Sequence, residues 1–189
     1  MADFHKAFDI TMGHEGGYVY DPNDAGGETY KGISKVYNAS WSGWNIIEVE
    51  RNSSYFPHHL HTVSDLQYEV ESFYKEKYWD VNLLDQFDQS VANEMFDTGI
   101  NLGVVRAAKF LQRALNYLNR NGSLFDDLVD DGIIGNKTFS AMLRIAHEKD
   151  GEVLLKIMNV LQGMHYLDYM KKSPTQEKYA RGWFTRVSL

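Results

Sequence analysis

The sequence predicts an all-α fold with one small β-hairpin or turn lobe after the first helix. Apolar residues recur at helical spacing through most of the 189 residues. The main early interruption, residues 18–34, is rich in glycine and in the turn-forming pairs Asp-Pro, Asn-Asp and Gly-Gly. A chain of this length can bury a core of its own without disulfides or metals.

The first helix is predicted over about residues 3–15. Its apolar stripe includes Phe4, Phe8 and Met12, and the pair Gly16-Gly17 permits the left-handed turn that ends many helices. Residues 18–34 then form the turns or small hairpin of the β lobe, where we expect all the β structure of the chain.

A helix is also predicted from Ser64 to about Trp79-Asp80. Ser64 and Gln67 have the spacing of a capping box, and apolar residues follow at helical intervals. Between the β lobe and this helix, residues 36–62 show a weak pattern, so we expect a loop or short helices there.

The second half of the chain is predicted to be helical, with a break of acids and glycines at residues 126–138. The widest apolar stripes indicate buried helices. The predicted helices cover residues 89–101, 104–119, 137–147 and 152–171, followed by a short terminal element from Pro174. We assign residues 1–100 to a catalytic region and residues 101–189 to a C-terminal region that packs into the same globule.

Composition excludes several classes of protein. A net charge of -7 argues against a nucleic-acid binder, which needs clustered Lys and Arg. The chain has no cysteine, and it contains neither a phosphate-binding glycine loop nor a G-x-S-x-G motif. No span of about 18 apolar residues is present, so an integral membrane protein is not expected. We expect no cofactor.

Residues 14–34 place acids among turns and glycines in a pattern that suits glycoside hydrolysis. Glu15 stands at the end of the predicted first helix, where the helix dipole raises a carboxyl pKa and favours a general acid. Asp24 and Thr29 follow in the spacing Glu-x8-Asp-x4-Thr. They could hold a water on the opposite face of the sugar, as an inverting mechanism requires. Turn formation alone would also explain Asp-Pro-Asn-Asp.

The stretch EGGYVYDPNDAGGETYKGIS, residues 15–34, resembles the signature of the family 108 glycoside hydrolases. These are lysozyme-like N-acetylmuramidases of phage, prophage and secretion-associated origin, also described as secretion activators. KEKYWD, FDTGINLG and AAKFLQRALN, at residues 75–80, 96–103 and 107–116, resemble later blocks of the same proteins. DDGIIGNKT, residues 130–138, resembles the peptidoglycan-binding region that follows in them.

The resemblance implies a lysozyme-like fold and hydrolysis of the β-1,4 bond between N-acetylmuramic acid and N-acetylglucosamine. It assigns the essential acid to Glu15. Asp24 and Thr29 fall close to the Glu-Asp-Thr spacing of phage-type lysozymes, although Thr29 arrives one residue early. Whether Asp21 or Asp24 handles the water stays open.

The expected partner is the glycan strand of peptidoglycan, bound by a monomer. Residues 1–6 lack the basic and apolar regions of a signal peptide. We therefore expect an endolysin made in the bacterial cytoplasm, which acts on the wall after lysis, through a holin-type pore or by a dedicated export route. The alternatives are a lytic transglycosylase and a non-catalytic wall-binding or secretion-accessory protein.

Further candidate substrate contacts share either an aromatic ring or a place in the signature. Aromatic side chains can stack on sugar faces and bond hydroxyls with their polar ends. Glycine lets the backbone approach a bulky substrate. The candidates are Tyr18, Asp21, Gly27, Tyr78, Trp79 and Asn101. Tyr78 and Trp79 would equally suit core packing, and Asn101 shares a helix face with Glu94 and Asp97 that borders the cleft or is solvated.

No metal site is expected. His58, His59 and His61 lie close together, but no carboxylate or cysteine completes a recognisable ligand spacing. Residues 130–135 lack the alternating oxygen ligands of a calcium loop, and turn chemistry before a helix explains them.

Overall fold

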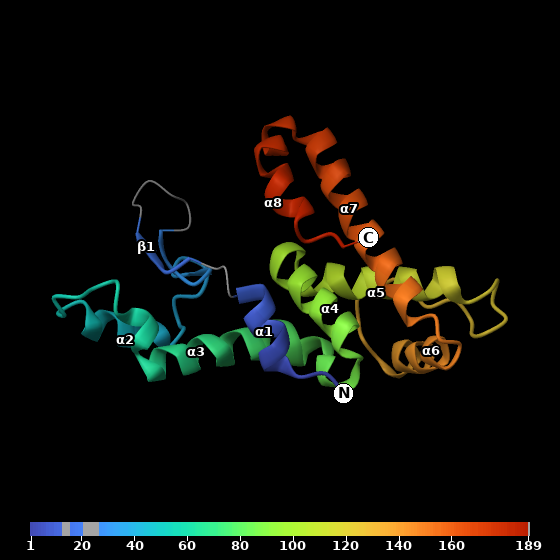
Figure 1. The fold of residues 1–189 in the computed structure, drawn as a ribbon, viewed down its shortest axis with the longest axis horizontal. Coiled ribbons are helices and arrows are strands. Elements are labelled where there is room, and N and C mark those ends of the chain that lie inside the picture. The colour runs from blue at the N-terminus through green and yellow to red at the C-terminus, as the bar shows by residue number, and fades with distance from the viewer. Residues whose placement is uncertain (13–15, 21–26, 189) are drawn as a thin grey trace. The chain divides into compact units, whose positions relative to one another are not determined.

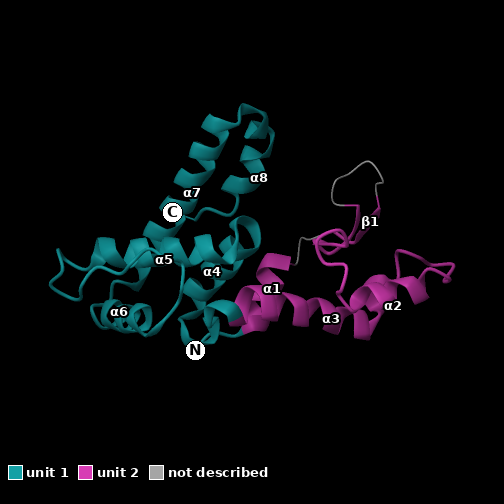
Figure 2. Cartoon of the chain, turned by 180° about the vertical axis from the view of Figure 1, so that it is seen from behind, with its two compact units in different colours: residues 1–3, 81–189 teal, residues 4–80 magenta. Residues whose placement is uncertain are grey.

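The computed structural model of the chain describes residues 1–12, 16–20 and 27–188. Helices dominate these residues, and the described strands belong to one small antiparallel sheet that follows the first helix (Figure 1). The predicted fold class is confirmed. The described chain divides into two compact units (Figure 2), which we call the N-terminal unit, residues 4–80, and the C-terminal unit, residues 1–3 and 81–189.

The N-terminal unit contains the sheet and the helices around it. Its elements are α1 (Phe4–Met12), β1 (Tyr18–Tyr20), β2 (Glu28–Tyr30), β3 (Ile33–Ser34), α2 (Gly43–Glu50), η1 (Leu60–Thr62), α3 (Ser64–Tyr74) and the π-turn η2 (Lys75–Trp79). The apolar face of α1 packs on α3 and the π-turn. Phe4 lies edge-to-face against Trp79 at 5.6 Å between ring centroids, and Phe8 lies 5.9 Å from Tyr74.

The sheet is ordered β1-β2-β3, with β2 in the centre. Tyr18 is opposite Tyr30 and Tyr20 is opposite Glu28, while Tyr30 faces Ile33 across the second hairpin. The two residues of that hairpin, Lys31 and Gly32, have φ values of 43° and 79°. Two positive φ values in succession suit the right-handed twist of a two-residue hairpin turn, and glycine adopts the second one without steric cost.

The predicted capping box at the start of α3 is wrong. Val63 is the N-cap, and no side chain caps the helix. Gln67 instead donates from Nε2 to the Tyr30 hydroxyl at 2.9 Å and to the carbonyl of Leu60 at 2.8 Å. The Gln67 side chain therefore joins the β lobe to α3. Its amide forms these tertiary hydrogen bonds instead of the local capping bond that the sequence predicted.

The C-terminal unit is built around α4 and α5. The elements from its start onward are η3 (Asp80–Asn82), η4 (Leu84–Gln86), α4 (Gln89–Leu102), α5 (Val104–Leu118), α6 (Asn136–His147), α7 (Gly151–Lys172), η5 (Pro174–Tyr179) and α8 (Ala180–Phe184). Helix α5 packs against α4, α6 and α7. It buries one continuous stripe that includes Ala107, Leu111, Ala114 and Leu115, which explains its strong sequence signal.

The segment before α6 is a turn held by Gln112, a buried residue of α5. Its Oε1 accepts from the Gly132 amide at 2.8 Å, and its Nε2 donates to Asp131 Oδ1 at 2.8 Å. The same Asp131 oxygen accepts from the Ile133 amide at 2.8 Å. Asp131 therefore closes the turn through hydrogen bonds.

None of the helices in the described residues combines the length and the apolar character needed to cross a membrane.

Candidate functional site

Three acids of the predicted site, Glu15, Asp21 and Asp24, lie outside the described residues. The chain on either side of them is held by backbone hydrogen bonds. The Lys31 amide donates to the Gly17 carbonyl at 3.3 Å, and the pairing of Tyr20 with Glu28 joins the strands that flank residues 21–26. These hydrogen bonds thus fix the described residues that adjoin the three acids in the sequence.

Thr29 lies at the middle of the central strand, paired with Val19 on one side and with Ser34 on the other. Successive side chains of a strand point to opposite faces. Glu28 and Tyr30 are buried, whereas Thr29 is half-buried and Val19 is exposed. The Thr29 hydroxyl therefore belongs to the outward face of the sheet, away from the two buried neighbours.

Gly27, the predicted close-approach glycine, precedes β2 with φ of 59°. A Cβ there would lie 3.2 Å from Cγ2 of Val36. Both the backbone angle and the neighbouring side chain favour glycine, so the fold itself explains Gly27.

A buried acid that the sequence did not single out, Glu28, forms the electrostatic centre of the β lobe. The Nζ atom of Lys35 lies 2.8 Å from its Oε2, and the Arg51 guanidinium contacts its Oε1. Arg51 also donates from Nε to Glu48 at 2.8 Å. Cations engage both carboxylate oxygens of Glu28, so this residue connects the sheet with α2 and is not open to a sugar. No local pattern could have indicated a partner 23 residues away.

Tyr18 belongs to the same cluster. Its ring lies edge-to-face on Phe56 at 5.0 Å, and the Arg51 guanidinium lies 5.6 Å from its centroid. Burial raises the pKa of the Tyr18 hydroxyl above 10. The neighbouring Tyr20 is 63% exposed, so among the described residues of β1 it presents the more accessible ring for stacking on a sugar.

The second hairpin docks on α3 through the turn residue Lys31. Its Nζ donates to Gln67 Oε1 at 2.7 Å, and its carbonyl accepts from the Tyr74 hydroxyl at 2.7 Å. Burial lowers the pKa of the Lys31 ammonium. These bonds give the β lobe a rigid support on α3.

Tyr78 and Trp79 both lie in the π-turn and differ in exposure. Trp79 is fully buried against Phe4, so its position is that of core packing. Tyr78 is half-buried and stacks on Tyr74 at 5.5 Å between centroids, and burial raises its pKa. Of the two, only Tyr78 retains surface with which to contact a substrate.

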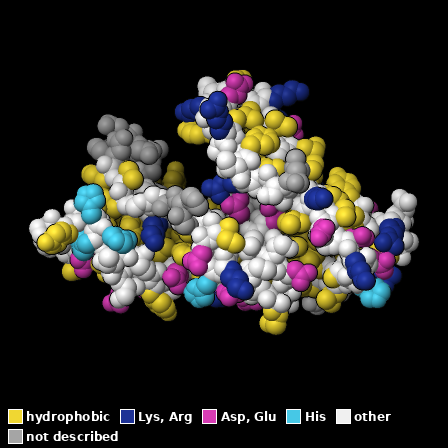
Figure 3. Space-filling view, viewed as in Figure 1, with side chains coloured by type: hydrophobic (Ala, Val, Ile, Leu, Met, Phe, Trp, Pro, Cys, Tyr) yellow, Lys and Arg dark blue, Asp and Glu magenta, His cyan; other side chains and the backbone are white. Residues whose placement is uncertain are grey.

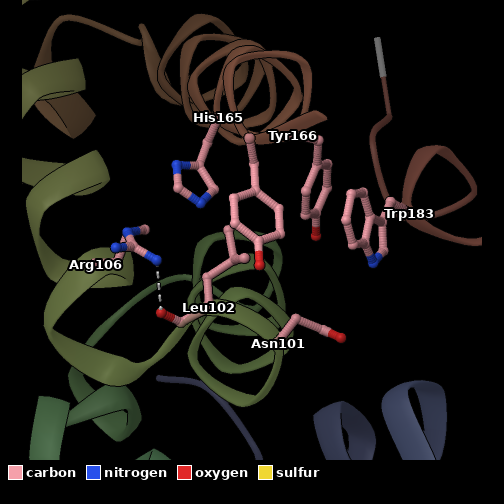
Figure 4. Close-up of a pocket in the computed structure, with 7 residues that line it drawn as sticks. Asn101, Leu102, Arg106, His165, Tyr166 and Trp183 are labelled. Atoms are coloured by element: carbon pink, nitrogen blue, oxygen red, sulfur yellow. Dashed lines mark hydrogen bonds between the residues drawn. The ribbon is translucent and has the colours of Figure 1, made fainter. Parts of the chain in front are cut away.

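Asn101 lies in the C-terminal unit and lines a cavity of about 350 Å³ (Figure 4). Its Nδ2 donates to the Asp97 carbonyl one helical turn earlier at 2.8 Å. Arg106 of α5, His165 of α7 and Trp183 of α8 line the same cavity. The sequence indicated none of these three as functional, because they come from separate helices and share no motif.

The two acids on the same helix face as Asn101, Glu94 and Asp97, are half-buried, whereas Asn101 itself is exposed. Glu94 accepts from Thr98 and from Asn159 Nδ2, each at 3.1 Å. Burial raises the pKa of Glu94 to about 7, and the neighbouring Asp97 adds to the increase. Burial also raises the pKa of Asp97, against the opposing effect of its ion pair with Arg186. This face packs against α7 and the residues after α8.

The side chains of two of the three histidines after α2, His59 and His61, form hydrogen bonds close to them in the sequence. His59 Nε2 lies 2.7 Å from Glu50 Oε2, and its hydrogen bond with that acid raises the pKa of the imidazole. His61 Nδ1 lies 2.7 Å from the carbonyl of His58. Histidine side chains gather on the surface beside α2 (Figure 3). Within the described ranges, no group of three His, Cys, Asp or Glu side chains is arranged to hold a metal ion.

Comparisons with known proteins agree with this architecture. The family model described as "Glycosyl hydrolase 108" matches residues 8–103, and the one described as "Predicted Peptidoglycan domain" matches residues 106–188. A solved structure described as "Structure of Brucella abortus SagA" is similar with a TM-score of 0.59 and 26% identity, over 97% of this chain and 88% of that one. A comparison with curated proteins gave no match. The chain therefore belongs to the glycosyl hydrolase 108 family and carries a C-terminal peptidoglycan-binding region.

Proposed function

We propose that the protein is an N-acetylmuramidase that hydrolyses the β-1,4 bond between N-acetylmuramic acid and N-acetylglucosamine in peptidoglycan. The observation that carries this proposal is the glycosyl hydrolase 108 match over residues 8–103, which includes the whole E-G-G-Y block. The second match, to a predicted peptidoglycan domain over residues 106–188, supports the same polymer as substrate.

In the proposed reaction, Glu15 protonates the glycosidic oxygen as the bond to the leaving sugar breaks. Asp24, helped by the Thr29 hydroxyl, accepts a proton from water as that water attacks the opposite face of the sugar. The result is an inverting displacement, in which water supplies both the new hydroxyl and the proton that restores the acid. The outward position of Thr29 on the central strand supports its access to water.

The arrangement around Glu28 supports the assignment by removing a competing acid. Glu28 lies inside the signature, three residues before Lys31, but its two oxygens engage Lys35 and Arg51. The acids of the signature that remain for proton transfer are Glu15, before β1 in the sequence, and Asp21 and Asp24, after it. Asp21 remains the alternative to Asp24 for handling the water.

The experiment is digestion of purified sacculi by the wild-type protein and by Glu15→Gln, with product masses read by mass spectrometry. Wild type should release muropeptides with a reducing N-acetylmuramic acid, and the rate of Glu15→Gln should be lower by roughly 100-fold to 10,000-fold, the loss expected when acid catalysis is removed. A matched exposed variant in the same unit, Glu76→Gln, should retain full activity.

Each other outcome is informative. Products 18 mass units lighter, with an anhydro sugar, would identify a lytic transglycosylase. Full activity of Glu15→Gln would remove the assignment of the acid. A wild-type protein that binds sacculi and releases nothing would instead be the non-catalytic wall-binding protein.

A further inference from the structure

The cavity of the C-terminal unit is a second candidate binding site, formed by four helices. Asn101 closes it from the end of α4, Arg106 from the first turns of α5, His165 and Tyr166 from α7, and Trp183 from α8 (Figure 4). Its volume of about 350 Å³ lies in the range of small-ligand sites. All the cavity residues belong to one unit, so the site is complete within it.

Aromatic rings form one wall of the cavity and hold each other in place. The Tyr166 and Trp183 rings stack at 5.2 Å between centroids with an interplanar angle of 17°. Tyr169 stacks with His165 at 6.4 Å and 7°. Tyr166 is 1% exposed whereas Tyr169 is 44% exposed, so the wall runs from the buried interior to the surface. It gives the cavity an apolar and preorganised side.

The opposite side carries a cation with unused donors. Arg106 is exposed, and its Nη1 makes a long bond of 3.3 Å to the carbonyl of Leu102, the bond drawn in Figure 4. Within the described part of the chain, no carboxylate lies within ion-pair distance of Arg106. A guanidinium has five N–H donors in a fork that matches a carboxylate, so most of its capacity faces solvent and the cavity.

The charge around the cavity favours an anion although the whole chain is acidic. Lys and Arg side chains gather over the end of α7 and the neighbouring α8 (Figure 3). The cationic side chains of this region are Lys171, Lys172, Lys178 and Arg181. Burial lowers the pKa of His165, and the nearby Arg106 and Lys172 lower it further, against Asp168. An anion in the cavity would therefore meet a positive field.

We propose that this cavity binds the carboxylate of a peptidoglycan stem peptide, with Arg106 as its anchor and the aromatic wall against the adjoining apolar groups. The choice of peptidoglycan rests on the proposed function. The carboxylate itself follows from the guanidinium, which pairs with no carboxylate of the described residues, and from the neighbouring lysines. The cavity and the proposed catalytic residues lie in different units, so a peptide bound in the cavity would not occupy the catalytic site. It would keep the enzyme on the wall between cleavage events.

The experiment uses the full chain with Glu15→Gln, so that no probe is cleaved, and isothermal titration calorimetry. The first probe is N-acetylglucosaminyl-N-acetylmuramyl tetrapeptide with free carboxylates, and the second is the same compound with its carboxylates amidated. The third is the disaccharide without peptide, with the lactyl carboxylate of its N-acetylmuramic acid amidated. Only the first probe should bind the cavity, and Arg106→Ala should weaken its binding at least tenfold.

Two further variants separate charge from geometry. Arg106→Lys keeps the charge but loses the planar fork, so we expect an intermediate loss of about threefold to tenfold. Arg144→Ala removes a similarly exposed arginine from α6 and should leave the affinity within twofold of the parent. Because Arg106 is exposed, its truncation should leave the melting temperature unchanged, which circular dichroism can verify.

Equal binding of the free and amidated probes, or an unchanged affinity in Arg106→Ala, would overturn the proposal. These results do not depend on hydrolysis. The product masses from wild-type protein test the muramidase assignment, whereas calorimetry on the inactive variant tests the cavity, so each proposal can fail separately.

Discussion

Replacing Glu94 by glutamine should stabilise the protein at neutral pH and remove a pH dependence of its stability. Glu94 lies in α4, where burial raises its pKa from the ordinary 4.5 to about 7. The folded state therefore binds a proton between these values while the unfolded state has released it. By linkage, the free energy of unfolding must fall as pH rises through this interval and stay low above it.

The magnitude follows from the two pKa values. At 1.36 kcal/mol per pH unit, the interval from 4.5 to about 7 corresponds to an upper limit of about 3 kcal/mol. For a chain of this length that is a shift of roughly 6–12 °C in melting temperature. Glutamine matches the protonated acid in shape: its oxygen can accept from Asn159 Nδ2, and its NH2 group can donate to the Thr98 hydroxyl. It therefore keeps both contacts and avoids the cost of a buried charge.

The assay is urea unfolding followed by circular dichroism at half-unit steps from pH 5 to pH 8. Wild type should lose stability across this range, and Glu94→Gln should be flatter and more stable at pH 8. A residual slope is expected from Asp97, whose pKa is also raised by burial. The matched control is Glu177→Gln, an exposed acid of the same unit, which should stay within about 0.5 kcal/mol of wild type. A Glu94→Gln protein with the full wild-type slope would refute the reasoning.

Two further substitutions test the two units separately by chemical denaturation. Arg51→Met leaves the buried Glu28 with one of its two cations, and we expect a loss of about 2 kcal/mol, less than a fully buried pair because Arg51 is one-third exposed; an unchanged midpoint would contradict a structural role for the pair. Gly132→Ala should cost at least about 2 kcal/mol, because φ is 79° and the added Cβ would meet Val105 Cγ1 at 2.6 Å. Gly151→Ala, in the first turn of α7 with open space around it, should be close to neutral, and equal effects of the two would exclude the steric explanation.

The long helices could be predicted from the sequence because their signal is local. The apolar stripe of residues 104–119 repeats every three or four positions, and α5 follows it as Val104–Leu118. The β lobe was equally predictable, because the glycines and the Asp-Pro pair of residues 16–34 favour turns over a helix. The prediction of a capping box was wrong because the signal that decides the position of Gln67 is not local. Gln67 bonds Tyr30, 37 residues away, and short-range spacing carries no information about such a partner.

The same distinction holds for the candidate sites. The signature placed Thr29 and Tyr18 in one lobe, and they lie on its neighbouring strands. It could not show that Glu28 would be held between Lys35 and Arg51, because that arginine comes from the end of α2, 23 residues further along the chain. The cavity with Arg106 and Trp183 could not be predicted from the sequence either. Its walls come from residues 77 positions apart, which only the fold brings together.

The sequence by itself determined the fold class, the family and the residue types available for acid catalysis, since these depend on periodicity and on one contiguous motif. The tertiary structure alone decided which charges are buried, which are paired and which face a cavity. Burial and pairing set the pKa of an acid and the freedom of a cation, and both depend on neighbours that the chain brings together only when it folds.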